Sequence, residues 1–526
     1  MKTFAGKAAV TADKIRGGYY TPAPIARFLA GWVTHAGPRV LEPSCGDGQI
    51  LRELAALSDQ ARGVELVAAE AAKARTFAPV DTADLFSWSG GRDWDGVAGN
   101  PPYIRFGHWP ARQREPALAA LHREGLRPNR LTNAWVPFVV ASTTLVREGG
   151  RVGLVLPAEL LQVGYAAQLR DFLVSRYREI TLLSFGRLVF EGVLQEVVLF
   201  CGVVGPGPAR IRTVQLDDAD ALVAANLDVP SAPALRHDHE KWTTYFLEPS
   251  QICTLRGLKE SGRLTRLGLL AEVDVGIVTG RNSFFTFTDA QAHELGLTPY
   301  CVPLVSRSAQ LSGLVYDNDC RTIDLTAGQR AWLLHAPAQP QDGALLAHIA
   351  AGEAAGVHRG YKCSLRKPWW VTPSLWVPDL FMLRQIHLSA RLTVNGAGAT
   401  STDTVHRVRV APGTEPHALA AVFHNSATFA FAEIMGRSYG GGIQELEPAE
   451  AERLPVPPPA CADPDLAGDV DLLLRANEIE KALDLVDRRV LIEKLGVSPE
   501  VVAQCRAAWL ALRHRRTARR ARRESR

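Results

Sequence analysis

The stretch Arg39-Val40-Leu41-Glu42-Pro43-Ser44-Cys45-Gly46-Asp47-Gly48 joins a short apolar run to a glycine-containing turn, and a helical pattern follows at 47–57. Glycines in such a turn let the backbone bend tightly and approach a ligand, and the helix behind it offers amide donors. The turn has Gly-x-Gly but lacks the third glycine of Gly-x-Gly-x-x-Gly, and it has no Gly-Lys-Ser/Thr. These absences argue against a pyrophosphate site or a P-loop. By itself the stretch is equally compatible with a plain structural turn.

Around this stretch, the first 205 residues alternate short β-branched runs with helical segments, which is typical of a doubly wound α/β sheet. Helices fit at 47–57 and 132–147. The connection 186–195 is too short for a helical crossover, so the strand that follows it should be antiparallel. Seven strands with an inverted last one is an unusual count for a dinucleotide-binding Rossmann domain. The predicted strands are 39–43, 61–66, 79–84, 95–99, 151–156, 179–185 and 196–203.

Two acidic residues stand at the ends of the second and third predicted strands. Glu65 comes 19 residues after Gly46, a distance at which a carboxylate can accept hydrogen bonds from a ribose diol. Asp84 can accept from an adenine amine, while the apolar Leu85 and Phe86 that follow it cover the ring. Alone, each acid would be an ordinary strand-end residue. Together with the glycine turn they predict an adenosine site without phosphates.

Asn100-Pro101-Pro102-Tyr103 follows the fourth predicted strand, which lies beside the first across the switch point of such a sheet. An adenine amine is a weak nucleophile because its lone pair is delocalised into the ring. The Asn100 side-chain oxygen and the Pro101 carbonyl can hold both amine hydrogens, and the two prolines restrict the backbone that carries them. Tyr103 offers a stacking face for the base. The tetrapeptide therefore indicates chemistry on a planar amine rather than a simple proline turn.

With these motifs, the chain resembles the γ class of N6-adenine DNA methyltransferases of type II restriction–modification systems, firmly over 15–205 and more loosely over 250–460. The resemblance implies a class I S-adenosylmethionine-dependent methyltransferase fold, with a seven-stranded, mostly parallel sheet and an antiparallel last strand. It implies S-adenosylmethionine as cofactor and a flipped adenine in double-stranded DNA as substrate. It assigns Phe190 to stacking on that base opposite Tyr103. The implied cofactor-binding residues are Tyr20, Thr21, Glu42, Pro43, Cys45, Gly46, Gly48, Glu65, Asp84, Leu85, Phe86 and Asn100.

Three domains are expected: a catalytic domain at 1–245, a mixed α/β target-recognition domain at 246–460, and C-terminal helices with a basic tail at 461–526. Pro455-Val456-Pro457-Pro458-Pro459 is interpreted as a rigid linker. A helix with apolar residues at 479, 483, 486 and 490 should end at Gly496, and a second helix should begin at Ser498-Pro499. Surface ion pairs or core tryptophans explain most basic and aromatic residues of the middle domain. As a set, however, the following residues favour DNA contact: Arg281, Asn282, Arg366, Lys367, Trp369, Trp370, His406 and Arg407.

The net charge of +4 is uneven, because residues 513–526 contain eight arginines and one glutamate. This tail is interpreted as a disordered basic arm that contacts phosphates or simply keeps the chain soluble. The eight cysteines form no CxxC pair, which suits a reducing cytoplasm, and no metal site is predicted. No apolar run reaches 18 residues, so no membrane span is expected.

Several alternatives stay open at this point. RNA or protein-glutamine methyltransferases also hold a planar amine or amide with this tetrapeptide, although the 200-residue domain after the catalytic one speaks against both. N4-cytosine methylation is disfavoured by asparagine, rather than serine, before Pro101. A third hypothesis is that the chain is a non-catalytic DNA-specificity subunit. A methylase without a nuclease of its own, working beside a separate restriction endonuclease, is expected.

Overall fold

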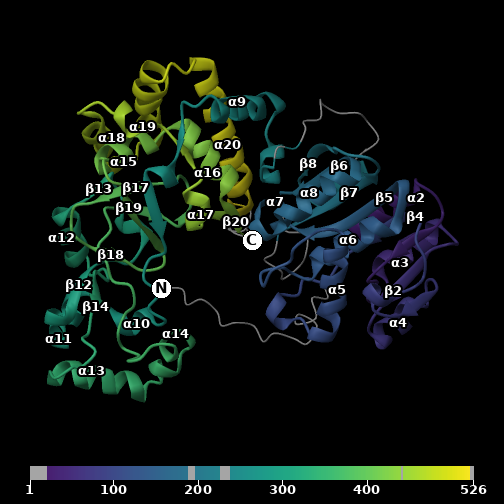
Figure 1. Ribbon diagram of the computed structural model, residues 1–526, viewed down its shortest axis with the longest axis horizontal. Coiled ribbons are helices and arrows are strands. Elements are labelled where there is room, and N and C mark those ends of the chain that lie inside the picture. Colours follow the sequence, from purple (N-terminus) through teal and green to yellow (C-terminus); the bar gives the residue numbers. More distant parts are fainter. Residues whose placement is uncertain (1–20, 187–195, 225–236, 238, 440–441, 522–526) are drawn as a thin grey trace. The chain divides into compact units, whose positions relative to one another are not determined.

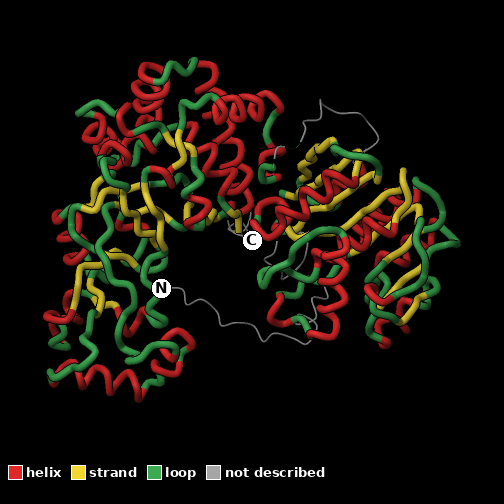
Figure 2. Tube along the Cα trace, in the orientation of Figure 1, coloured by secondary structure: helices red, strands yellow, loops and turns green. Residues whose placement is uncertain are grey.

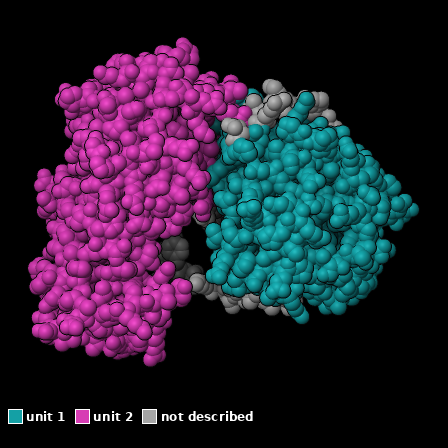
Figure 3. Space-filling model, viewed as in Figure 1, with its two compact units in different colours: residues 1–249, 439–441, 518–526 teal, residues 250–438, 442–517 magenta. Residues whose placement is uncertain are grey.

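The computed structural model describes residues 21–186, 196–224, 237, 239–439 and 442–521. The chain divides into two compact units, which are distinguished by colour in Figure 3. Unit 1 comprises 1–249, 439–441 and 518–526, and unit 2 comprises 250–438 and 442–517. Most of the segment predicted as separate C-terminal helices is therefore counted within unit 2.

Unit 1 is built on an eight-stranded sheet in the order β3-β2-β1-β4-β5-β7-β6-β8 (Figures 1 and 2). β1 pairs in parallel with both β2 and β4, so the strand order reverses between β1 and β4. Ligands of open α/β sheets bind at such a switch point, outside the carboxyl ends of the strands. The strands are β1 Val40–Glu42, β2 Arg62–Glu65, β3 Val80–Thr82, β4 Trp94–Gly99, β5 Val146–Pro157, β6 Tyr177–Phe185, β7 Val197–Val204 and β8 Arg210–Leu216.

The last part of the sheet confirms the predicted antiparallel strand and corrects the predicted strand count. β7 lies between β5 and β6 and is antiparallel to both, as predicted from the short connection before it. β8 is an additional strand, parallel to β6 at the edge of the sheet, so the sheet has eight strands rather than seven. No strand was predicted here, and Arg210, Arg212 and Gln215 interrupt the apolar pattern of the segment. Charged residues are common on edge strands, where they hinder pairing with other chains.

Helices cover both faces of this sheet. α2, α3 and α4 contact one another in series on one face, and α6 and α8 contact each other on the opposite face, as right-handed crossovers require. The central strands are buried by both layers, which explains their continuous apolar runs. The helices are α2 Ala23–Thr34, α3 Gln49–Leu57, α4 Ala68–Ala74, α5 Ala111–Arg123, α6 Trp135–Leu145, α7 Glu159–Gln162 and α8 Ala167–Arg176.

Unit 2 contains two main sheets, in the orders β10-β19-β15-β17-β13 and β11-β14-β12-β18, and β16 pairs with β21 separately. Phe285, Leu333 and Leu334 are fully buried in one apolar cluster, and Phe381 and Val405 are fully buried in another. The strands are β9 Thr265–Arg266, β10 Ala271–Asp274, β11 Thr286–Phe287, β12 Cys301–Val305, β13 Val315–Tyr316, β14 Trp332–Leu334, β15 Leu380–Leu383, β16 Gln385–Ile386, β17 Leu392–Asn395, β18 Thr400–Ser401, β19 Val405–Val410, β20 Arg437–Tyr439, β21 Ile443–Glu445 and β22 Pro455–Val456.

The proline-rich stretch at 455–459 is not the predicted linker. Its first two residues form β22, which pairs antiparallel with β9, and Val456 is fully buried. Proline is compatible with such a short two-stranded pairing because each strand has a free edge. The remaining helices of the chain are α9 Pro249–Glu260, α10 Asn282–Phe285, α11 Asp289–Glu294, α12 Asn318–Thr326, α13 Gly343–Ala354, α14 Tyr361–Ser364, α15 Pro416–Phe423, α16 Ser426–Met435, α17 Pro448–Ala451, α18 Leu466–Arg475, α19 Ile479–Val486 and α20 Pro499–Ala521.

The C-terminal helices have the predicted boundaries, but they are bonded to α16 of unit 2 and do not form the separate segment that was predicted. α19 continues as a π-helix over Asp487–Lys494, the chain turns at Gly496 with φ of 62°, and α20 begins at Pro499. The Asp487 carboxylate is buried, accepts from the Ser426 backbone N–H at 2.8 Å, and pairs with Arg506 at 3.1 Å. These bonds join the π-helix and α20 to the first turn of α16.

The arginine-rich tail is helical where the structure describes it, which corrects the prediction of a disordered arm. α20 extends to Ala521, and residues 522–526 lie outside the described residues. Arg516 is 2% exposed and pairs with Glu433 of α16 through two bonds of 2.7 and 3.0 Å. Part of the positive charge therefore belongs to the core of unit 2.

Among the described residues, no single helix has the length and hydropathy needed to cross a membrane. Only the bent pair of α15 and α16 reaches that length and composition, and it reaches them jointly. Leu419, Phe423 and Phe429 on these helices are buried in unit 2.

Candidate active site

A cavity of about 440 Å³ opens in unit 1 at the carboxyl ends of β1, β2, β3 and β4. Its position is the switch point of the sheet, where the four predicted motifs converge. The motifs come from segments that are far apart in the sequence, and the parallel strands bring their ends together. The predicted site residues that line the cavity are Thr21, Glu42, Pro43, Cys45, Gly46, Glu65, Asp84, Leu85, Phe86, Asn100 and Pro102.

The glycine turn between β1 and α3 forms the floor of this cavity. Gly46 and Gly48 adopt φ angles of 54° and 91°, in the left-handed region that favours glycine. A Cβ at Gly48 would lie 3.0 Å from the Cα of Ala74 on α4. Gly48 is not among the residues that line the cavity, and it permits close packing of the turn against α4. Its contact with the cofactor stays a prediction.

Glu65 connects the end of β2 to the glycine turn. Its Oε2 accepts from the Gly46 backbone N–H at 2.9 Å, and its Oε1 accepts from the Val67 backbone N–H at 2.8 Å. A carboxylate has about four lone-pair sites, so both oxygens keep capacity for further donors such as ribose hydroxyls. The same carboxylate therefore shapes the turn and faces the cavity.

Asp84 and the residues after it form the next part of the wall. Asp84 Oδ1 accepts from the Phe86 backbone N–H at 3.0 Å and caps the 3₁₀ turn Leu85–Ser87. Leu85 and Phe86 both line the cavity, so both offer apolar surface to a planar ring. Phe86 also makes an edge contact with Phe138, with ring centroids 5.0 Å apart.

The Asn-Pro-Pro-Tyr tetrapeptide leaves β4 on the other side of the switch point. Asn100 and Pro102 line the cavity, and Asn100 Nδ2 donates to Thr21 Oγ1 at 3.2 Å. The Tyr103 hydroxyl donates to the Val155 carbonyl on β5 at 2.9 Å, which ties the last residue of the tetrapeptide to the sheet. Pro101 and Tyr103 do not line the cavity themselves. Tyr20 and Phe190, also predicted for this site, lie outside the described residues.

Glu42 and Ser44 give the cavity an electrostatic preference. The Glu42 side chain is buried, and desolvation raises its pKa well above the usual range, with Asp47 and Glu65 adding to the shift. Within the described part of the chain, Glu42 Oε2 and Ser44 Oγ have no hydrogen-bond partner. Unpaired buried polar atoms are costly, so these two groups favour a ligand that brings a positive charge and donors.

The cavity fits S-adenosylmethionine on these observations. Glu42 and Ser44 suit the cationic amino acid end, Glu65 suits the ribose, and Asp84 with Leu85 and Phe86 suits the adenine. Among the residues that the structure describes, no lysine or arginine lines the cavity, which makes this lining unsuited to phosphate groups.

Sequence reasoning missed the wall opposite the strand ends. His108, Trp109 and Gln113 line the cavity from the 3₁₀ turn Phe106–His108 and from α5, and Phe138 lines it from α6. Trp109 is 4% exposed and packs in a small cluster with Phe86 and Ile104. His108 follows Asn100 closely in sequence, which was a weak signal, because a chain leaving β4 must first cross the same edge of the sheet. The sequence held no comparable signal for Phe138.

The residues predicted to contact DNA lie in unit 2, and the structure separates them into two groups. Arg281, Asn282 and Lys367 are exposed. Gly280 has a φ of 86°, and a Cβ there would lie 2.9 Å from the side chain of Lys362, so the loop before α10 touches α14. Figure 1 shows α10 and α14 in the same part of unit 2. The structure thus brings Arg281 and Lys367 to neighbouring segments.

The other predicted DNA contacts are structural. His406 is fully buried, with Nε2 2.7 Å from the Leu446 carbonyl, and the prediction of DNA contact for it is wrong in this fold. The same correction applies to Arg407, which is 2% exposed and donates to the carbonyls of Val275 and Ser374. Each reaches an internal acceptor, as buried polar groups must.

Trp369 is buried, whereas Trp370 and Arg366 are half-buried, and all three donate hydrogen bonds within unit 2. Trp369 is 9% exposed and donates to Glu353 at 3.2 Å, and Trp370 donates to the Pro337 carbonyl at 3.1 Å. Arg366 donates to the Lys362 carbonyl at 3.1 Å.

An open sheet with an inverted strand inserted near its edge, and an adenosine-type cavity without cationic residues at its switch point, define a class I S-adenosylmethionine-dependent methyltransferase. The cofactor is therefore S-adenosylmethionine.

Comparison with known proteins gives the family. The sequence profile described as "Eco57I restriction-modification methylase" matches residues 53–190, and that of "Type II methyltransferase M.Eco57I, C-terminal domain" matches residues 239–491. These two matches and the relatives below identify the chain as a type II restriction–modification methylase. A modification methylase of such a system acts on DNA, so the chain is a DNA methyltransferase.

Individual relatives extend over most of the chain. Type II methyltransferase M.AccI of Acinetobacter calcoaceticus is 21% identical over 83% of this chain and 84% of its own length. Type II methyltransferase M.XamI of Xanthomonas campestris pv. amaranthicola is 22% identical, with shares of 84% and 85%. The solved type IIG restriction endonuclease BpuSI is 16% identical, with a TM-score of 0.40, and covers 96% of this chain and 66% of that one.

Proposed function

We propose that this enzyme methylates the N6 amine of an adenine that is flipped out of double-stranded DNA, at a specific sequence. The observation that carries the proposal is the position of Asn100: its side chain lines the cofactor cavity directly beyond β4, and two prolines follow it. The base must leave the stack because its amine cannot reach a buried cavity from within a duplex.

The residues of the tetrapeptide would hold the amine. The Asn100 side-chain oxygen and the Pro101 carbonyl accept its two hydrogens, which draws the nitrogen toward tetrahedral geometry and directs its lone pair into the cavity. The cofactor supplies an activated methyl group bound to a sulfonium. Tyr103, anchored to Val155, offers its ring to one face of the base, and Phe190 is proposed for the other face. Both carbonyl-type acceptors also stabilise the positive charge that develops on the amine.

The contribution of Asn100 is tested with the full-length protein, tritiated S-adenosylmethionine and unmodified genomic DNA. We expect label in DNA, and an Asn100→Ala variant should transfer methyl groups about 100-fold more slowly or worse, as loss of one transition-state hydrogen bond implies. Asn318→Ala, at an exposed position at the start of α12, is the matched control and should keep the wild-type rate.

Undiminished transfer by Asn100→Ala would refute the assignment of this residue. Label that enters RNA or a protein glutamine, with none in DNA, would instead favour the alternative substrates that share this amine-holding tetrapeptide.

Unit 2 is proposed to read the DNA sequence, with Arg281, Asn282 and Lys367 as contacts. Support comes from their exposure and from the contact between the loop before α10 and α14. Arginine can bind guanine and asparagine can bind adenine through paired hydrogen bonds, while lysine contacts phosphates. A separate restriction endonuclease that cleaves the same sequence is the proposed biological partner.

A further inference from the structure

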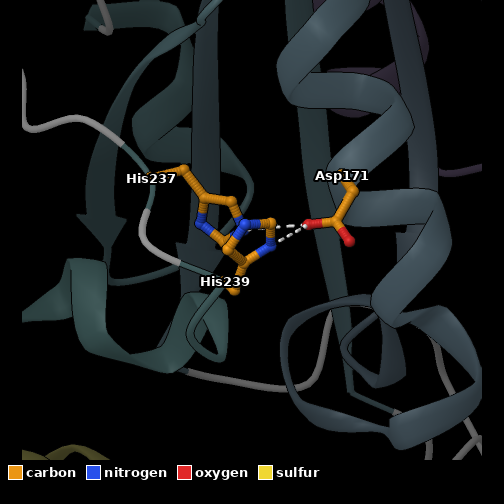
Figure 4. A group of neighbouring side chains, drawn as sticks. All are labelled: Asp171, His237 and His239. Carbon is orange, nitrogen blue, oxygen red and sulfur yellow. Dashed lines mark hydrogen bonds and ion pairs between the residues drawn. The ribbon is translucent and has the colours of Figure 1, made fainter.

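A cluster of two histidines and one aspartate lies in unit 1 (Figure 4), and none of the three lines the cofactor cavity. Asp171 projects from α8, and His237 and His239 come from the segment before the 3₁₀ helix Trp242–Phe246. Asp171 Oδ1 is 3.5 Å from His237 Nε2 and 3.1 Å from His239 Nδ1. Within the described ranges, this is the one group of three potential metal-ligand atoms that lie within 4.8 Å of one another.

The spacing of these atoms matches the coordination shell of a small divalent ion. A tetrahedral zinc ion with bonds of about 2.0–2.2 Å places neighbouring ligand atoms about 3.3 Å apart. The two separations from Asp171 Oδ1, 3.5 and 3.1 Å, bracket that value. An ion could therefore bind all three groups with little movement of the backbone.

The His237 ring is held in the orientation that a metal ligand requires. Its Nδ1 is 3.0 Å from the Tyr245 hydroxyl, and its side chain is 4% exposed. With the proton on Nδ1 donated to Tyr245, the lone pair of Nε2 points toward Asp171. Metal-binding histidines characteristically use their second nitrogen in this way, because the bond fixes both the tautomer and the ring.

The charge state of the cluster suits a cation as well. The Asp171 and Glu240 carboxylates bring negative charge to the cluster. Arg170 is the unfavourable neighbour, but its guanidinium donates to the Leu160 and Val163 carbonyls. Asp171 and His239 are 47% and 84% exposed, so an ion can enter from solvent and retain water as a further ligand.

We propose that Asp171, His237 and His239 form a structural binding site for a divalent transition-metal ion of the zinc class. None of the three lines the cofactor cavity. The ion would connect α8 to the segment that precedes the 3₁₀ helix Trp242–Phe246, which contacts α7 and β8. The site therefore holds the end of unit 1 onto its own sheet and takes no part in methyl transfer. His-x-His at 237–239 was a signal in the sequence, but its carboxylate partner lies 66 or more residues earlier.

The test uses full-length protein that has been treated with chelator, dialysed and titrated with Zn²⁺. We expect about one bound Zn²⁺ per chain by elemental analysis, and a rise in the unfolding temperature of unit 1. Asp171→Asn and His239→Ala, at exposed positions, should lose at least tenfold in affinity. Tyr245→Phe should weaken binding about 10- to 100-fold, because it removes the bond that orients His237.

His293→Ala is the matched control. His293 lies 3.8 Å from Asp289 on the same helix, so it forms a histidine–carboxylate pair without a third ligand. This variant should bind Zn²⁺ as the wild type does. Absence of stoichiometric binding by the wild type, or equal binding by Asp171→Asn and His239→Ala, would overturn the proposal and leave an ordinary ion pair. Methylation activity should be retained in both variants, so the result is separate from the proposed function.

Discussion

The Glu42 carboxyl is a group in the cavity whose protonation depends strongly on its surroundings. It is buried at the end of β1, its pKa is raised by desolvation, and one of its oxygens has no hydrogen-bond partner among the described residues. In the absence of a cation, its protonated form is favoured. A positively charged ligand reverses this preference, because it stabilises the carboxylate.

This yields a prediction for the pH dependence of cofactor binding. A raised pKa means that Glu42 must release a proton to pair with the cofactor, so affinity should rise between about pH 5 and about pH 7, below the titration of an α-amino group. Calorimetry in buffers of different ionisation enthalpy should detect that proton. Glu42→Gln should bind more weakly and without this pH dependence. Wild-type affinity that is constant over the same range would contradict the assignment.

Among the individual residues that line the cofactor cavity, the sequence predicted most of those at the strand ends and few of those on the wall formed by α5 and α6. Glu65, Asp84 and Asn100 were predictable because each follows a strand, and parallel strands place their ends together. Trp109 and Phe138 were not, because their contact with the cavity depends on the path of α5 and on the packing of α6. His406 was misassigned because residue type does not distinguish a buried acceptor network from a recognition surface.

In unit 1, α2 and β4 pack closely because a glycine of β4 stands at their contact. A Cβ on Gly96 of β4 would lie 2.8 Å from the Val33 carbonyl oxygen, which belongs to the backbone of α2 and cannot rotate away. Gly96→Ala should therefore destabilise unit 1 by about 1–3 kcal/mol, as overpacked cores do. Urea denaturation of the full-length protein measures this change.

Gly31 provides the control within the same helix. A Cβ there meets nothing within 4 Å, so Gly31→Ala should be neutral or stabilise by up to about 1 kcal/mol through helix propensity. Equal destabilisation by both substitutions would show that the α2–β4 contact is not the cause.

In unit 2, a buried ion pair joins two helices, α16 and α20. Arg516 and Glu433 are 3% and 4% exposed at their side chains, and burial raises the pKa of Glu433 while Arg516 opposes the shift. Arg516→Ala leaves a buried carboxyl without its partner and should cost about 3–5 kcal/mol in the free energy of unfolding. Replacing both residues with leucine should recover most of that loss. A double variant as unstable as the single one would contradict this account.

The sequence patterns predicted where helices and strands lie along the chain better than they predicted how those elements pair and pack. The inverted strand β7 and the helix boundary at Gly496 were read correctly from connection length and glycine placement. β8 was missed because an edge strand can carry arginines, and the proline-rich linker proved to be strand β22 because proline tolerates a free edge.

At the scale of the whole molecule, catalysis and sequence recognition are assigned to different units. If unit 2 reads DNA, Arg281→Ala should weaken binding by about 1–3 kcal/mol and relax specificity at one base pair. Lys367→Ala should weaken binding similarly for all sequences and reduce its salt dependence. Binding titrations at several salt concentrations separate these effects. Unchanged affinity in both variants would place the recognition surface elsewhere in unit 2.

The most direct test of the account is the identity of the methylated base. DNA from a host without adenine methylation is incubated with the purified protein and S-adenosylmethionine, digested to nucleosides and analysed by mass spectrometry. We predict N6-methyldeoxyadenosine, formed about 100-fold more slowly or worse when the Asn100→Ala variant is used. Methylated cytosine, or modified adenine produced equally by the variant, would contradict the central claim that Asn100-Pro101-Pro102-Tyr103 holds the adenine amine.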